Sequence, residues 1–284
     1  MRDRHSGHFS EALAHEMESS MSGKWVITVL AWLIYGFLLA PTLVVVIASF
    51  NAGAFLTFPP QGLSFRWYNT FFHNRVFLDA IETSLYVALI ATGVSGIIST
   101  MAALYAARST PSVSGAVRLA LTLPLILPEV LSAIGLLFFF YATGLGVRYS
   151  IALVFGHVLI TLPFIYINVS NALRGFDWSW EMAARSLGAS PVRAFRRVTF
   201  PLILPGIMNG CLFAFIASFD SFSTSFLLKD IGTATLPIQL FDYLRLNFTP
   251  EAAAVSTVTV AVTIFLVFVM EKFILPTSLD EKEK

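Results

Sequence analysis

Residues 181–201 read EMAARSLGASPVRAFRRVTFP, a polar stretch that carries four arginines. Long apolar runs flank it, over residues 150–173 on one side and 202–228 on the other. Each run is longer than the roughly 20 apolar residues that an α-helix needs to cross a bilayer. The pattern therefore predicts a short loop that projects from a membrane between two transmembrane helices.

The composition of the whole chain agrees with a membrane protein. Of its 284 residues, 56% are hydrophobic and only 12% are charged, which is about half the charge of an average soluble domain. The single cysteine, Cys211, excludes an internal disulfide and lies in an apolar run, where we interpret it as a small core residue. The composition predicts an all-α, polytopic membrane protein with one membrane domain.

Six apolar runs are predicted to span the membrane. They extend over residues 25–50, 81–107, 119–143, 150–173, 202–228 and 252–275. The first run is longer than the core of a signal peptide and no clean cleavage site follows it, so we interpret it as an uncleaved helix. We expect a mobile tail or short surface helix over residues 1–24, a transmembrane domain over 25–275 and a C-terminal tail over 276–284.

The distribution of Lys and Arg predicts the orientation of these helices, because cytoplasmic loops carry an excess of both residues. With the N-terminus inside, thirteen of the eighteen Lys and Arg residues fall on the cytoplasmic side. Both termini are therefore predicted to be cytoplasmic. The segment over residues 174–201, called here the 174–201 loop, is then also cytoplasmic.

The 174–201 loop contains local signals for two short helices with a sharp bend between them. Asp177 or Ser179 can cap the start of the first helix. Gly188 suits the left-handed position that ends a helix. Ser190 followed by Pro191 predicts a second start, with a capping hydroxyl and proline at the first helical position.

The spacing within this loop also predicts two distinct faces. Ala183, Ala184 and Leu187 fall on one face, where small side chains would let the helix lie deep in a groove of another protein. Three cations share another face, and their partner is either lipid headgroups or acidic residues of a cytoplasmic partner protein. These cations are Arg193, Arg196 and Arg197.

This loop resembles the EAA loop of the membrane subunits of bacterial ATP-binding-cassette importers. The pattern of that family is E-A-A, three residues, G, nine residues, I, one residue, L-P. The matching positions are Ala183, Ala184, Gly188, Val198 and Pro201. Met182 stands where the pattern has Glu, and Phe200 stands where it has Leu. Met182 cannot offer the charged contact of that Glu, and Glu181 points about 100° away from it on a helix.

The resemblance extends over roughly residues 65–275. The further matching segments are 124–129, His157 with 162–164, 173–177, 218–220, 235–237 and 250–251. Their combination is most similar to the second permease subunit of spermidine/putrescine importers. The resemblance implies a type I importer permease fold and a polyamine substrate, either putrescine or spermidine.

The same resemblance implies a set of partners in a bacterial inner membrane. A homologous permease, as a heterodimer partner, completes the transmembrane pathway, and a periplasmic binding protein delivers the substrate. Two copies of an ATPase subunit hold ATP and Mg²⁺, so this chain is non-catalytic and binds no cofactor itself. Contact with the ATPase is assigned to Glu181, Met182, Ala183, Ala184, Leu187, Gly188, Arg193 and Arg197.

Polar residues at membrane depth are the candidates for the substrate pathway, because charged groups there tend to face protein or a watery cavity. The candidates are Glu129, Asp220, Ser221 and Ser225. Asp220 would pair with an ammonium group among aromatic rings, or its carboxylate is satisfied by neighbouring hydroxyls. Polyamine relatives often have a second acidic residue where Ser221 stands.

Two of these polar positions also have structural interpretations. Glu129 follows Pro128, where a broken helix leaves backbone amides unpaired. In the structural interpretation its carboxylate bonds to those amides or to an Arg. In the functional interpretation it acts in the substrate pathway or its gate. His157 is interpreted as a hydrogen-bond partner between helices. The spacing of these residues supports no metal site.

Alternatives within the importer class are an opine, an amino-acid derivative, another small organic amine or an organic anion as substrate. A secondary transporter usually shows two related halves, and we find no such duplication. An intramembrane enzyme would need a nucleophile with a base or a metal-ligand spacing, and a nucleic-acid binder would need a basic patch; the sequence has none of these patterns.

Overall fold

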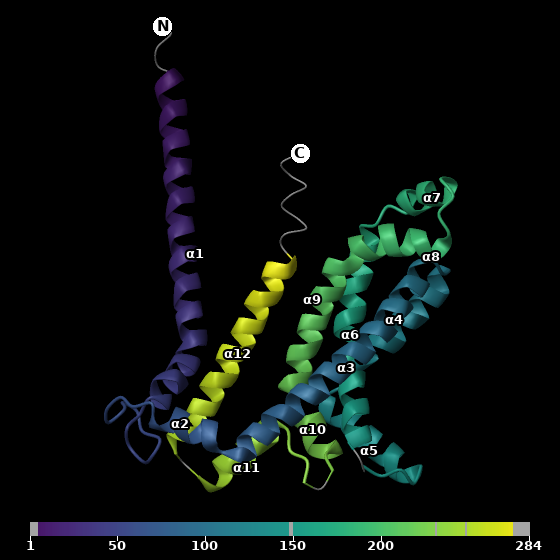
Figure 1. Cartoon of the computed structure of the whole chain (residues 1–284). Helices are drawn as coiled ribbons and strands as arrows, with labels where there is room; N and C mark the ends of the chain where they lie inside the picture. The colour runs from purple at the N-terminus through teal and green to yellow at the C-terminus, as the bar shows by residue number, and fades with distance from the viewer. Residues whose placement is uncertain (1–4, 148–149, 231, 248, 275–284) are drawn as a thin grey trace. The chain divides into compact units, whose positions relative to one another are not determined.

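The computed structural model describes residues 5–147, 150–230, 232–247 and 249–274, and the predicted all-α class is confirmed over these ranges (Figure 1). Residues 276–284, the predicted C-terminal tail, lie outside them. The helices are α1 (His5–Ser49), α2 (Arg66–His73), α3 (Arg75–Ala107), α4 (Pro111–Ile126), α5 (Glu129–Ala142), α6 (Ile151–Arg174), α7 (Ser179–Ser186), α8 (Pro191–Ala194), the π-helix η2 (Phe195–Thr199), α9 (Phe200–Phe219), α10 (Phe222–Leu228), α11 (Leu236–Leu246) and α12 (Pro250–Ile274).

The chain divides into two compact units, one with Met1–Tyr68 and Thr249–Thr257 and the other with Asn69–Phe248 and Val258–Lys284. In the first unit α1 runs from His5 to Ser49 without a break, so helix begins inside the predicted tail. Most large apolar side chains from Trp25 onward are exposed, as expected for a helix that faces lipid.

A buried asparagine organises the segment that follows α1. The side chain of Asn51 donates to the Phe55 carbonyl at 3.0 Å and accepts from the Gln61 amide at 3.0 Å. The indole nitrogen of Trp67 donates to the Asn51 carbonyl at 2.9 Å. One residue therefore closes a loop of about ten residues against the end of the first span.

Among the described residues five helices are long and apolar enough to cross a membrane, and α4 with α5 makes a sixth span if the pair is counted as one. The break predicted at Pro128 within the apolar run over residues 119–143 is confirmed, because α4 and α5 meet there at 104°. Leu127 is extended with ψ 141° and Pro128 follows it, and a residue before proline is disfavoured in the helical conformation. The helix predicted over 202–228 is also broken, between α9 and α10.

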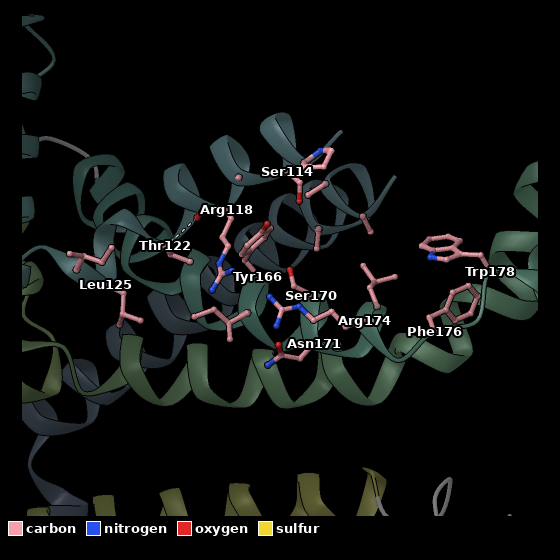
Figure 2. Close-up of a pocket in the computed structure, with 18 residues that line it drawn as sticks. Ser114, Arg118, Thr122, Leu125, Tyr166, Ser170, Asn171, Arg174, Phe176 and Trp178 are labelled. Carbon is pink, nitrogen blue, oxygen red and sulfur yellow. Dashed lines mark hydrogen bonds between the residues drawn. The ribbon is translucent and has the colours of Figure 1, made fainter. Parts of the chain in front are cut away.

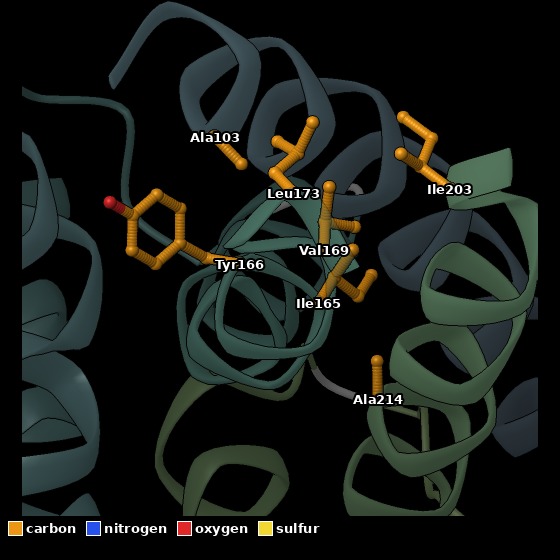
Figure 3. Packing of buried hydrophobic residues seen from close by; sticks show 7 residues of the cluster. All are labelled: Ala103, Ile165, Tyr166, Val169, Leu173, Ile203 and Ala214. Carbon is orange, nitrogen blue, oxygen red and sulfur yellow. The ribbon is translucent and has the colours of Figure 1, made fainter. Parts of the chain in front are cut away.

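In the second unit α3, α6 and α9 lie side by side and enclose an apolar core (Figures 1 and 3). The buried residues of this core are Ala103, Ile165, Tyr166, Val169, Leu173, Ile203 and Ala214. Close approach of α6 and α9 depends on Gly206 and Gly210, where an added Cβ would lie 2.7 Å from Ala172 and from Ile165. The core fixes the ends of the helices that carry the polar sites described below.

Candidate functional site

The 174–201 loop begins with the short helix α7. The carboxylate of Asp177 accepts from the amide of Ser179 at 2.9 Å, and this contact holds the pKa of Asp177 below its usual value. Gly188 follows the end of α7 with φ +88°, so the predicted left-handed position is confirmed. The predicted second start is also confirmed, because the Ser190 hydroxyl accepts from the Arg193 amide at 3.4 Å.

Beyond Ser190 the loop differs from the prediction of two separate short helices. The helix that starts at Pro191 continues through the π-helix η2 directly into α9. The wide π turn lies immediately before Pro201, whose nitrogen has no hydrogen to donate to the preceding turn. The structure therefore joins the loop to the fifth span as one continuous helical segment.

Glu181 connects α7 to two other elements of the chain. Its Oε2 atom accepts from the Arg108 guanidinium at 2.8 Å and from the Thr199 hydroxyl at 2.8 Å. The Arg108 guanidinium also lies over the Trp178 ring, 4.9 Å from its centroid. The side chain of Glu181 is only 13% exposed. The carboxylate therefore holds α7 against the end of α3 and the start of α9.

The opposite side of α7 is exposed. Met182 is 61% exposed and Leu187 is 91% exposed; Ala183 is exposed as well, whereas Ala184 is partly buried. Of the three residues predicted to share one face, Ala183 and Leu187 are thus exposed and Ala184 is partly buried. An apolar surface without charge, formed by Met182, Ala183 and Leu187, faces away from the helices of this chain.

The three arginines that follow gather as predicted. Arg193, Arg196 and Arg197 are exposed, and with Ser190 and Val192 they line one shallow hollow of about 510 Å³. The 174–201 loop thus presents an apolar contact surface and a cationic one.

Glu129 lies where two broken helices meet. Its Oε1 atom accepts from the Ser221 hydroxyl at 2.5 Å, the Thr224 amide at 3.1 Å and the Thr224 hydroxyl at 2.8 Å. The first residue of α5 thereby caps the amino end of α10. These contacts agree with the structural interpretation of Glu129, in which the carboxylate bonds to backbone amides. The bonded amide, however, belongs to α10 and not to the break at Pro128.

His157 is buried between three helices. Its Nδ1 atom is 2.8 Å from the Ser218 hydroxyl on α9, and its Nε2 atom is 3.0 Å from the Ser225 hydroxyl on α10. The prediction of a helix–helix hydrogen-bond partner is confirmed. The imidazole and the Glu129 carboxylate therefore hold α10 from two sides.

Asp220 is placed differently from the other pathway candidates. It is the exposed C-cap residue of α9, and among the described residues its carboxylate has no hydrogen-bond partner. The alternative that neighbouring hydroxyls satisfy it is wrong, because those of Ser221 and Ser225 are buried and bonded to Glu129 and His157. A solute can therefore reach Asp220 without breaking an internal contact.

Comparison with known proteins identifies the family. Residues 96–277, more than half of the chain, match the family described as binding-protein-dependent transport system inner membrane component. The chain belongs to this family.

This inner membrane component is also similar to two known permeases over most of its length. It is 29% identical to the spermidine/putrescine transport system permease protein PotC of Haemophilus influenzae, over 83% of this chain and 91% of the relative. It is 32% identical to the putrescine transport system permease protein PotI of Escherichia coli strain K12, over 82% of this chain and 84% of the relative. The recognition of an importer permease from the loop motif is confirmed.

The fold of this inner membrane component is shared with a solved importer. A bacterial alginate ABC transporter, in complex with an alginate pentasaccharide-bound periplasmic protein, has a subunit that matches with a TM-score of 0.69 at 16% identity. The match covers 92% of this chain and 98% of that subunit. The predicted importer-permease fold is therefore confirmed, and the chain is a multi-pass membrane protein.

Several residues of these sites were missed by sequence reasoning. Arg108, Thr199 and Thr224 each contact a carboxylate that the sequence had singled out, and of the three only Thr199 lies within a recognised motif. Arg108 follows the last residue of α3, far from Glu181 in the sequence. Thr199 lies inside the loop pattern, so a search for polar partners within the loop could have found Thr199 but not Arg108.

Proposed function

We propose that this chain is one permease subunit of an ATP-driven, binding-protein-dependent polyamine importer of a bacterial inner membrane. The family match and the two polyamine permeases support this proposal. A homologous permease, as a heterodimer partner, forms the other half of the pathway. A periplasmic binding protein delivers the substrate, as the periplasmic protein bound to the alginate transporter illustrates.

In this proposal the 174–201 loop is the contact with the ATPase. The excess of Lys and Arg in the loop and at both ends of the chain supports a cytoplasmic position for all three. Met182, Ala183 and Leu187 offer the apolar part of the contact, and Arg193 and Arg197 offer the cationic part. Glu181 faces inward and positions α7. ATP and Mg²⁺ belong to the two ATPase subunits, and this chain carries no catalytic group.

The observation that carries the substrate assignment is the exposed carboxylate of Asp220. A protonated amine pairs with a carboxylate through charge-assisted hydrogen bonds, which are about twice as strong as neutral ones. Phe222 lies close by and pairs with Phe226 and Phe241, so aromatic faces for cation–π contact are near the carboxylate. We assign Asp220 to the substrate pathway.

Asp220→Asn is expected to raise the KM for putrescine uptake about tenfold, because a charge-assisted bond worth about 3 kcal/mol is replaced by a neutral one worth about half as much. The control is Asp79→Asn, which removes an exposed carboxylate at the amino end of α3. Transport kinetics in spheroplasts or proteoliposomes measure both variants. Unchanged kinetics for Asp220→Asn would show that the carboxylate does not contact the substrate.

The proposed function is tested by uptake of labelled putrescine and spermidine with and without this gene. We expect uptake to be lost on deletion and restored by the wild-type gene. Deletion of the partner ATPase should abolish uptake equally, because a secondary transporter would continue to work without it. Unchanged polyamine uptake in the deletion strain would reject the polyamine substrate. The importer role would then be tested separately, with the ligand that the binding protein carries.

A further inference from the structure

A large cavity in the second unit is not explained by the import of a cation. It has a volume of about 870 Å³ and lies between the loop-proximal ends of α3, α4 and α6, under Phe176 and Trp178 (Figure 2). Arg118 on α4 and Arg174 on α6 both line it. None of the described residues that line it is an Asp or a Glu.

The two arginines converge from facing helices. Figure 2 shows the guanidinium groups of both side chains directed into the cavity, with Ser170 and Asn171 beside Arg174. Among the described residues neither guanidinium has an ion pair or a hydrogen bond, whereas the nearby Arg108 is paired with Glu181. Two unpaired guanidinium groups near a membrane favour a ligand that supplies negative charge and several acceptor oxygens.

The remaining lining residues indicate the shape of that ligand. Ser114, Ser170 and Asn171 add neutral donors around the arginines. At the end of the cavity away from the loop, Leu125 and Ile126 are exposed and apolar. At the other end lie Phe176 and Trp178, and tryptophan is enriched at membrane interfaces. A polar, cationic centre thus continues into an apolar surface in the direction of the membrane interior.

We infer that this cavity binds a phosphate-bearing anion through Arg118 and Arg174, with the headgroup of an anionic phospholipid of the cytoplasmic leaflet as the favoured source. Basic pockets between transmembrane helices on the cytoplasmic side are suited to such headgroups. The apolar end at Leu125 and Ile126 accommodates the start of the acyl chains, which a free phosphate would leave uncovered. The inference is independent of the transported substrate.

Native mass spectrometry tests the inference on the full-length chain together with the subunits that co-purify with it. The protein in detergent is titrated with phosphatidylglycerol, with phosphatidylcholine of the same acyl chains, and separately with inorganic phosphate. We expect phosphatidylglycerol to bind about tenfold more tightly than phosphatidylcholine. This preference should be lost in the Arg118→Gln/Arg174→Gln double variant. The phosphate is the same in both lipids, but the two guanidinium groups attract the net negative charge of phosphatidylglycerol and are repelled by the quaternary ammonium of phosphatidylcholine.

Two further variants separate the cavity from general charge effects. Arg185→Gln/Lys272→Gln removes two exposed cations outside the cavity and should keep the preference. Gly115→Leu keeps all charges but fills the cavity, since an added Cβ at Gly115 meets nothing within 4 Å; it should weaken phosphatidylglycerol binding about tenfold without unfolding the helix.

The outcomes distinguish the sources of the anion. Selective phosphatidylglycerol binding that both cavity variants weaken supports a lipid site. Binding of inorganic phosphate that depends on Arg118 and Arg174, without lipid selectivity, supports the phosphate site but assigns it to a free ligand. Equal binding of both lipids with no phosphate binding, or an unchanged preference in the double variant, overturns the inference.

Discussion

Gly188→Val is expected to reduce ATP-driven import at least tenfold while the protein remains in the membrane. Gly188 has φ +88°, and an added Cβ would meet no atom within 4 Å. The expected defect is therefore conformational and not steric. An L-residue in the left-handed region costs about 1–2 kcal/mol, so valine should redirect the chain after α7 and displace the apolar surface of Met182, Ala183 and Leu187 from the ATPase.

The control for this prediction is Gly175→Val in the same loop. Gly175 has φ −86°, which every L-residue adopts, and its nearest neighbour for an added Cβ is 3.9 Å away. Uptake, ATP hydrolysis stimulated by the binding protein, and the amount of protein in the membrane are measured for both variants. Normal coupled uptake with Gly188→Val would contradict the assignment of this loop to ATPase contact.

Glu129→Leu is expected to destabilise the protein by about 3 kcal/mol and to abolish import. The carboxylate accepts three hydrogen bonds from Ser221 and Thr224, all on its Oε1 atom. A single bond to a charged acceptor is worth about 1.5–3 kcal/mol, and bonds in one network are not additive, so we expect their joint loss to cost about 3 kcal/mol. Leucine leaves those donors buried without an acceptor. Thermal unfolding of the purified protein in detergent should show a Tm lower by about 5–10 °C.

Glu129→Gln serves as the matched variant, because its amide oxygen still accepts from Ser221 or Thr224 without a charge. Its Tm should lie between those of the wild type and Glu129→Leu. Glu82→Leu removes an exposed carboxylate of α3 and should leave Tm nearly unchanged. A wild-type Tm for Glu129→Leu would show that the cap of α10 contributes little to stability.

The turns of the 174–201 loop could be predicted because their chemistry is local. Glycine at a left-handed position and serine before proline specify the backbone of their own few residues, so Gly188, Ser190 and Pro191 were assigned correctly. The six apolar runs were equally readable from length and composition. The π turn before Pro201 was not, because the same proline is compatible with either a new helix start or a widened turn in a continuing helix.

The breaks within the spans depend on contacts between distant residues. Pro128 marks the first break in the sequence, but no proline or glycine marks the second, at Asp220 and Ser221. That break is stabilised by Glu129, 92 residues away from Ser221. The ion pair of Glu181 likewise joins residues 73 apart. Spacing arguments cover one or two helical turns, so such partners become visible only in the folded chain.

Glu181 attaches α7 to the helical segment that continues into α9, so a displacement of α7 acts on α9. Glu181 binds Thr199, one residue before α9, and α9 has 20 residues, which corresponds to a length of about 30 Å. A tilt of about 10° at the loop end therefore moves the opposite end by about 5 Å. That opposite end carries Asp220 and adjoins α10, so a motion of α7 that tilted α9 by this angle would move Asp220 by nearly the pitch of one helical turn.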